Sequence, residues 1–214
     1  MRQFDFYIGA KVKCQDKHCG ELAGIVVDPE TQRMTGVIIK EGFLLPQNRV
    51  SPISQVQGAI GEEIYLSLRS DEFDFYPEYR VEEYEEPAAG LAASPPSVPS
   101  PQNFQQYGMV EPVVPMVKKL VQKGIVPGQV VIKQGMAVRN FGGEIGKVER
   151  VIADSKSAAI THLVVRRGLI FSEQLMVPIS AVESIAEGNI SVSCTSQEVE
   201  LLPLYNEKEL DLIR

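Results

Sequence analysis

Residues Met34–Gly42, with the sequence Met-Thr-Gly-Val-Ile-Ile-Lys-Glu-Gly, and residues Ile160–Gly168, with the sequence Ile-Thr-His-Leu-Val-Val-Arg-Arg-Gly, are two versions of one pattern. Each is an apolar, mostly β-branched run closed by a charged pair and a glycine, which predicts a strand followed by a turn. Glycine adopts a positive φ without the steric penalty of a Cβ, so it suits the turn. We therefore expect two copies of one β unit.

The two copies keep one separation along the chain. Four pairs of equivalent residues lie 126 positions apart (161 − 35, for example): Thr35 and Thr161, Gly42 and Gly168, Pro52 and Pro178, and Ile64 and Ile190. Nearer the start of each copy, Gly143-Glu144-Ile145 is similar to Gly20-Glu21-Leu22, and this match makes the second copy three residues longer before Asp154 than the first copy before Asp28. Because side chains alternate along a strand, we expect a bulge or a turn to absorb such an odd insertion.

Each copy predicts a series of short strands. In the first copy, the apolar runs Leu22–Val27 and Ile64–Leu68 lie on either side of the Met34–Lys40 strand, and Asp28-Pro29 has the composition of a tight turn. Prolines interrupt the run Val50–Val56, which therefore belongs at a sheet edge. Short strands with frequent turns, and no convincing helical periodicity, predict an all-β fold made of two small barrels or sandwiches.

The sequence between the copies has a different composition. Residues Asp71–Glu86 contain eight acidic residues against Arg80 alone. Residues Pro87–Gly108 are rich in Ala, Ser, Pro and Gln, which predicts a flexible linker because little apolar surface is available to offset the entropy of ordering. Val117–Lys123 has the pattern of a short amphipathic helical turn, and Gln129–Lys133 that of a leading strand for the second copy. The predicted organisation is a first β domain at 1–72, an acidic aromatic extension at 73–86, a Pro/Ser/Ala-rich flexible linker with the helical turn at 87–124, a second β domain at 125–205 and a tail at 206–214.

The composition restricts the class of protein. The chain has 214 residues, of which 44% are hydrophobic and 23% charged, and a formal net charge of −7, which argues against a protein that coats nucleic acid. No apolar run approaches the roughly 18 residues of a membrane span, and the N-terminal residues lack the apolar core of a secretory signal. Three cysteines do not make an even disulfide framework. We therefore predict a cytoplasmic protein.

The two copies resemble the PRC-barrel family. The resemblance rests on the order of several short segments and not on any one of them: Ile8-Gly9, Gly20-Glu21-Leu22, Asp28-Pro29-Glu30-Thr31, Gly36–Ile39 and Val50–Ile53 in the first copy, with Gly143–Val148, Ile160–Val165 and Val177–Ile179 in the second. It covers both copies and leaves out the linker and the tail.

The resemblance implies two PRC-type β-barrels in tandem, joined by the flexible linker. Members of this family include the cytoplasmic domain of the photosynthetic reaction-centre H subunit and the C-terminal domain of the small-subunit ribosome maturation factor, and both hold other macromolecules. The chain lacks the transmembrane helix of the former and the distinct N-terminal domain of the latter, so it is most similar to the bacterial proteins that contain tandem PRC-barrels. A shared fold does not by itself carry a function.

The candidates for chemistry are few. Cys14, His18 and Cys19 form a cluster of soft ligands, but a zinc site usually needs four, so a partly buried thiol near a turn is the preferred interpretation. His162 lies within an apolar strand without a recognisable nucleophile and acid beside it, so we expect a neutral histidine on a strand face. The glycines match no phosphate-binding template. We expect no catalytic residues, no metal site and no cofactor, and hence no enzyme.

Two surfaces are candidates for partner binding. The first is the aromatic and acidic stretch whose rings are Phe73, Phe75, Tyr76, Tyr79 and Tyr84. These rings either anchor a partner, with the acids steering the encounter, or pack against the first β unit and cover its edge.

The second surface is basic and centres on Arg166 and Arg167, with further basic residues at Lys147, Arg150, Lys118, Lys119 and Lys123. These charges either face RNA or an anionic lipid surface, or simply keep the protein soluble.

Three functions follow from these features. The first is a non-enzymatic adaptor that docks protein or ribonucleoprotein partners. The second is a ribosome- or RNA-associated assembly factor, for which direct nucleic-acid binding has weak support in the sequence. The third is a peripheral subunit of a membrane or photosynthetic complex, bound without a transmembrane segment.

Overall fold

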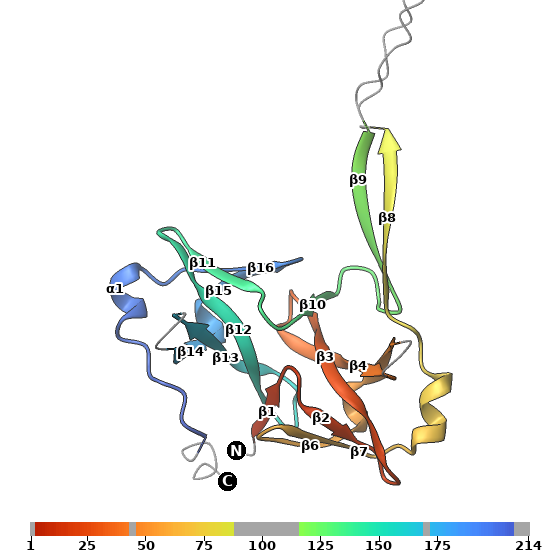
Figure 1. Ribbon diagram of the computed structural model, residues 1–214. Coiled ribbons are helices and arrows are strands. Elements are labelled where there is room, and N and C mark those ends of the chain that lie inside the picture. Colours follow the sequence, from red (N-terminus) through yellow and green to blue (C-terminus); the bar gives the residue numbers. More distant parts are fainter. Residues whose placement is uncertain (1–2, 43–45, 88–115, 169–171, 208–214) are drawn as a thin grey trace, which may run out of the picture. The chain divides into compact units, whose positions relative to one another are not determined.

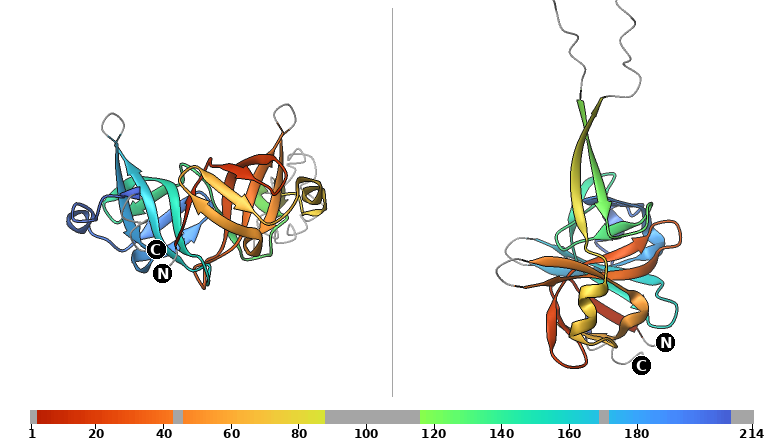
Figure 2. Two further views of the ribbon diagram at one scale, coloured as in Figure 1. Left: turned by 90° about the horizontal axis from the view of Figure 1, so that it is seen from below. Right: turned by 90° about the vertical axis from the view of Figure 1, so that its right-hand side faces the viewer.

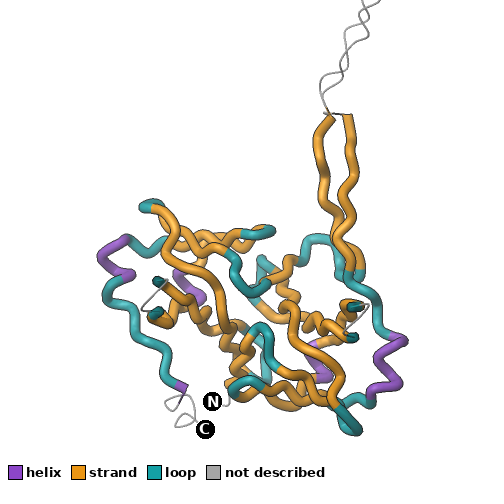
Figure 3. Tube along the Cα trace, viewed as in Figure 1, coloured by secondary structure: helices purple, strands orange, loops and turns teal. Residues whose placement is uncertain are grey.

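The computed structural model describes residues 3–42, 46–87, 116–168 and 172–207, and they are predominantly β, as predicted (Figures 1 and 3). Most of the predicted linker, residues 88–115, and residues 208–214 of the predicted tail lie outside the described residues. None of the described helices is long and apolar enough to cross a membrane.

Two seven-stranded sheets make up most of the structure, and their strand orders are the same. The first sheet has the order β5-β4-β3-β2-β7-β6, with strands β2 (Lys11–Lys13), β3 (His18–Asp28), β4 (Arg33–Glu41), β5 (Gln47–Pro52), β6 (Val56–Ile60) and β7 (Glu63–Leu66). The second has the order β14-β13-β12-β11-β16-β15, with strands β11 (Ala137–Asn140), β12 (Gly143–Asp154), β13 (Ile160–Arg167), β14 (Glu173–Pro178), β15 (Val182–Ala186) and β16 (Asn189–Val192). Neither sheet closes into a barrel through the described strands.

The seventh strand of each sheet comes from the other copy. Strand β1 (Gln3–Tyr7) pairs with β12, and β10 (Val130–Ile132) pairs with β3. Phe4 lies opposite Ala153 and Val130 lies opposite Val27, so the two exchanged strands keep the same register at a separation of 126 residues (130 − 4 and 153 − 27). The predicted strand at 129–133 is therefore present, but it completes the sheet of the first copy. Figure 1 shows β1 beside β12, and the left view of Figure 2 shows the two copies as similar groups of strands.

The separation of 126 residues holds throughout, and the predicted three-residue insertion is wrong. Val12 pairs with Gly20, and Val138 pairs with Gly146, so the counterpart of Gly20 is Gly146 and not Gly143. Close backbone contacts explain why both of these positions are glycine. A Cβ at Gly20 would collide with the carbonyl oxygen of Lys40, and one at Gly146 with that of Arg166. We call the two copies, with this register, the first and second repeats.

The repeats also meet at the tips of their central hairpins. The Met34 amide donates to the Ala158 carbonyl (2.9 Å), and the Ile160 amide donates to the Gln32 carbonyl (3.0 Å). These two bonds are equivalents of each other under the 126-residue shift. One cluster of buried side chains, including Phe6, Ile25, Leu163 and Val165 together with their neighbours, extends through both repeats. Residues Met1–Tyr79 and Gly124–Arg214 accordingly form one compact unit.

Residues Arg80–Lys123 form the second compact unit. Its described part is a two-stranded antiparallel sheet of β8 (Arg80–Pro87) and β9 (Met116–Lys123). The predicted helical turn at 117–123 is therefore wrong. Its residues pair across β8 instead, where the Lys123 ammonium lies 2.6 Å from the Glu82 carboxylate. A run of seven residues is too short for its pattern to distinguish a helical turn from a strand. The partner strand β8 lies before residues 88–115, so no local signal predicts the pairing.

Four short helical turns complete the part of the fold that the structure describes. Turns η1 (Ile53–Gln55) and η3 (Ile179–Ala181) each follow a proline and are equivalents under the 126-residue shift. Turns η2 (Ser70–Phe75) and α1 (Ser196–Val199) begin at equivalent positions as well. The last pair belongs to the segment that forms the candidate functional site.

Candidate functional site

Both repeats end in one ten-residue segment, which we call the terminal motif. It has the sequence Ser-Asp-Glu-Phe-Asp-Phe-Tyr-Pro-Glu-Tyr at 70–79 and Ser-Gln-Glu-Val-Glu-Leu-Leu-Pro-Leu-Tyr at 196–205. The acidic aromatic stretch predicted as an extension from residue 73 thus contains the last part of the first repeat. Serine, glutamate, proline and tyrosine occupy the same four positions in both copies.

Each terminal motif starts with a capped helical turn. The Glu72 carboxylate accepts a hydrogen bond from the Arg69 amide (2.7 Å), and the Glu198 carboxylate accepts one from the Thr195 amide (2.8 Å). Satisfying this free amide is the role of the glutamate in a capping box. The backbone amide of Thr195 also lowers the pKa of Glu198, together with the Thr195 hydroxyl.

The end of each terminal motif covers a sheet edge. In the first repeat, the Val50 amide donates to the Pro77 carbonyl (2.9 Å) and the Tyr79 amide donates to the Asn48 carbonyl (2.7 Å). In the second repeat, the Met176 amide donates to the Pro203 carbonyl (2.9 Å) and the Tyr205 amide to the Gln174 carbonyl (2.7 Å). Strands β5 and β14 are therefore paired along the edge that the rest of the sheet leaves open.

The predicted aromatic residues have different environments and do not form one surface. Phe73 and Tyr79 are buried, and Tyr76 is half-buried against the core. Phe75 is 89% exposed. Tyr84 belongs to the β8–β9 unit, where its hydroxyl donates to the Glu82 carboxylate.

Leu201 is a residue that the sequence reasoning missed. It is the counterpart of Phe75 (201 − 75 = 126) and is 82% exposed. The residues two places earlier, Phe73 and Val199, are both buried. The signal that would have found Leu201 is the 126-residue separation itself, followed beyond Ile190 to the end of the repeat.

The predicted basic surface is divided in the same way. Lys147 lies opposite Arg166 on neighbouring strands, and both are exposed. Arg167 instead forms an ion pair with Glu200 of the terminal motif (2.6 Å). Arg150 is buried. Only part of the predicted basic group is therefore available as a surface.

Arg150 belongs to a buried polar cluster that holds β1 in place. Its guanidinium lies 2.8 Å from the Asp5 carboxylate, and it also lies over the ring of Tyr7 (4.8 Å to the centroid) and the ring of Tyr205 (5.0 Å). The Tyr205 hydroxyl donates to the same carboxylate oxygen (2.6 Å). Desolvation raises the pKa of Asp5 and outweighs the opposing effects of Tyr205 and Arg150. The cluster joins the exchanged strand, the second sheet and the terminal motif, which is a structural role.

The cysteine cluster is a disulfide and not a set of metal ligands. Cys14 and Cys19 are bonded across the hairpin between β2 and β3, so the predicted free thiol is wrong for this pair, and Cys194 is the free cysteine. The tight hairpin brings the two residues together, with their Cα atoms 5.9 Å apart. Among the described residues, no three His, Cys, Asp or Glu side chains are grouped to hold a metal ion.

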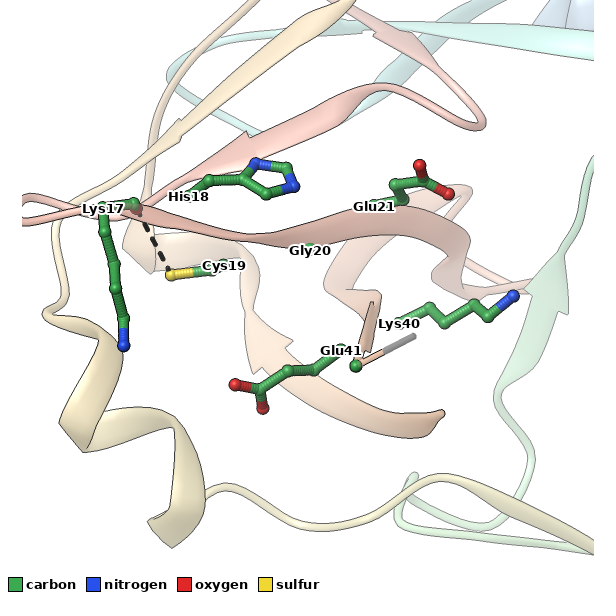
Figure 4. Close-up of a pocket in the computed structure, with 8 residues that line it drawn as sticks. Lys17, His18, Cys19, Gly20, Glu21, Lys40 and Glu41 are labelled. Atoms are coloured by element: carbon green, nitrogen blue, oxygen red, sulfur yellow. Dashed lines mark hydrogen bonds between the residues drawn. The ribbon is translucent and has the colours of Figure 1, made fainter. Parts of the chain in front are cut away.

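A cavity of about 640 Å³ lies beside this hairpin (Figure 4). Its lining includes charges of both signs, Lys17 and Lys40 with Glu21 and Glu41, and the exposed His18. Charges of both signs on exposed side chains do not define the chemistry of a ligand.

His162 lies on β13, half-buried, as expected for a histidine on a strand face. Burial lowers the pKa of its imidazole. The neutral ring is therefore favoured in the folded protein.

No family model matches the chain, and no curated protein matches it either.

Proposed function

We propose that this protein is a non-enzymatic docking scaffold that binds a protein or ribonucleoprotein partner through two equivalent faces. The observation that carries the proposal is the unbroken 126-residue register between the repeats, together with the exchange of β1 and β10. Each repeat supplies the first strand of the other repeat's sheet, so two related faces are held in one compact unit. A partner that offers two epitopes at matching positions would bind more tightly than one with a single epitope, by roughly 10²- to 10⁴-fold.

The contacts of the ionisable groups support a binding role. Asp5 and Arg150 hold an exchanged strand, Glu72 and Glu198 cap helical turns, and Arg167 pairs with Glu200. Each of these charges has a hydrogen-bond or ion-pair partner within the fold, whereas a catalytic site needs charges that face a substrate.

We further propose that each repeat corresponds to one PRC-type barrel. The shared strand order of the two repeats supports this proposal, as do the turns after Asp28 and Asp154. In those turns each carboxylate accepts backbone amides, and these hydrogen bonds lower the pKa of both aspartates.

The test is affinity purification of the full chain from the cells that produce it, with partner identification before and after RNase treatment and across a salt series. We expect one protein partner to remain after RNase and at raised salt. Recovery of RNA alone, lost steeply as salt rises, would support the assembly factor instead, with Lys147 and Arg166 as its first contacts. Membrane association released by a salt wash would support the peripheral subunit.

A further inference from the structure

We propose that the docking site is an apolar side chain presented at the same position of each terminal motif, Phe75 in the first repeat and Leu201 in the second, and that the partner is a protein with an apolar pocket and a basic rim. We call these two side chains the docking pair. This inference rests on the proposed docking function and specifies its surface.

The repeat itself identifies the docking pair. Large hydrophobic side chains exposed at single positions are common in soluble proteins and need no explanation. Among the exposed large hydrophobic residues that the structure describes, Phe75 and Leu201 are the only two that are counterparts under the 126-residue shift. Phe141, by contrast, is fully exposed, but its counterpart is Gln15. Both repeats have thus kept an exposed apolar group at one position.

Packing does not explain this choice of residue. Phe75 is 89% and Leu201 82% exposed, so their side chains contribute little to the core. The core contacts of the terminal motifs come instead from Phe73 and Val199, which are buried. A polar residue would satisfy the fold equally well and would avoid exposing apolar surface to water. A partner that covers the side chain accounts for an apolar residue in both repeats.

The backbone that carries the docking pair is held on both sides. A capping glutamate fixes the start of each helical turn, and the hydrogen bonds of Pro77 and Pro203 to β5 and β14 fix the segment that follows. A side chain on a backbone already ordered in this way loses less conformational entropy on binding than one on a mobile loop. This arrangement is what a binding anchor requires.

Acidic residues next to the docking pair define the chemistry of the partner. In the first repeat, Asp71, Glu72 and Asp74 lie on the same short turn as Phe75, and all three are exposed. In the second repeat, exposed Glu198 and Glu200 lie on the turn before Leu201. Ion pairs of Arg69 with Asp71, of Arg49 with Asp74 and of Arg167 with Glu200 compensate three of these five acids. Glu72 and Glu198, which are counterparts under the 126-residue shift, are the two that remain. Lysine or arginine around the partner's pocket would complement the remaining acids.

The first experiment places a photo-reactive benzophenone amino acid at position 75 or 201 of the full chain in the cells that produce it. Position 141 serves as the control, because Phe141 is equally exposed and has no apolar counterpart. We expect positions 75 and 201 to cross-link to the same protein, at peptides that combine apolar residues with lysine or arginine. Different proteins at the two positions, or the same products at position 141, would overturn the proposal.

The second experiment measures the affinity of the purified partner for Phe75→Ser, Leu201→Ser and the double variant, with Phe141→Ser as the matched control. We expect about a tenfold loss for each single variant, a larger loss for the double variant and none for the control. Because the replaced side chains are exposed, circular dichroism and the unfolding midpoint should match those of the unmodified protein.

The outcomes separate this inference from the proposed function. If a protein partner binds the double variant as tightly as the unmodified chain, the docking pair is wrong and the docking function stands. If native purification yields no protein partner, both are wrong. Sedimentation of the chain alone tests a second copy as the partner: a dimer that the double variant loses would replace the basic-rimmed pocket with self-association.

Discussion

The two repeats differ at a pair of residues that attaches each exchanged strand to its sheet. Arg150 and Asp5 form a buried ion pair in the second sheet, whereas their counterparts in the first sheet are Gly24 and Val131. A Cβ at Gly24 would lie only 2.8 Å from a methyl group of Val131. One sheet therefore attaches its exchanged strand through charge and the other through close apolar packing.

This difference predicts the result of a double-mutant cycle. Asp5→Val leaves the Arg150 guanidinium buried without its carboxylate, and we expect a loss of about 3–5 kcal/mol in the free energy of unfolding. The double variant Asp5→Val/Arg150→Gly copies the first sheet, and we expect it to be more stable than the single Asp5→Val variant. Urea unfolding measures both. If the double variant loses as much stability as Asp5→Val alone, or as much as the two single variants together, the ion pair is not the main interaction of Asp5.

A second prediction at this scale concerns His162. Burial lowers its pKa below that of the unfolded chain, so the unfolded state binds the proton more readily. Stability is then fully present above the unfolded pKa of about 6.5 and falls as the pH drops through the lower folded value. We expect His162→Gln to reduce the loss of stability between about pH 7 and pH 5. A variant with an unchanged pH profile would show that the imidazole stays accessible in the folded protein.

At the scale of elements, the hairpin of β2 and β3 shows how the two repeats use different chemistry for one turn. Cys14 and Cys19 close it with a disulfide in the first repeat. The counterparts in the second repeat are Asn140 and Ile145, where the Asn140 side chain accepts the Gly142 amide (2.8 Å) and donates to the Cys194 carbonyl (2.9 Å).

The disulfide predicts how many cysteines react with an alkylating reagent. In the protein unfolded without reductant, we expect only Cys194 to react with an alkylating reagent, and all three cysteines after reduction, as read by mass spectrometry. The closed loop is short, so reduction should lower the free energy of unfolding by only about 2 kcal/mol. Cys194→Ser is the control and should show no alkylation before reduction. Three reactive thiols without reductant would contradict the bond.

At the scale of the whole molecule, the exchange of strands makes each sheet depend on both repeats. The first sheet takes Val130–Ile132 from beyond the β8–β9 unit, and the second takes Gln3–Tyr7 from the start of the chain. The buried side chains of both repeats belong to one core. Two independent domains on a tether would lack these connections.

The dependence can be tested by cutting the chain. A specific protease site inserted among residues 88–115 lies outside every described element of the two sheets. We expect the two fragments to co-elute in size-exclusion chromatography after cleavage and to separate only in denaturant. Fragments that separate in native buffer would contradict the exchange. Phe6→Asp, which places a charge in the buried face of β1, is the companion variant that should weaken the association.

The sequence predicts the strands well, because alternation and turn residues are local signals. The strands on either side of Asp28 and of Asp154 are where the pattern placed them. The predicted edge run Val50–Val56 is only partly a strand: β5 ends at Pro52, turn η1 occupies 53–55, and β6 begins at Val56. The exchange of β1 and β10 has no local signal, because an apolar strand pairs equally well with either sheet. The same limit applies to the candidate site: Phe73 and Phe75 are indistinguishable as letters, and only the fold shows which of them is buried.

The pairing of Gln3 with Asp154 also has a consequence for synthesis on the ribosome. Strand β1 finds its partner only after about 150 further residues have been added, which takes roughly 7 to 30 seconds at about 5–20 residues per second. Until then its apolar residues have no sheet to join. The first sheet likewise waits for Val130–Ile132 before it has all its strands. Both sheets are therefore complete only after residues 130–154 have been synthesised, so neither repeat finishes folding on its own during translation.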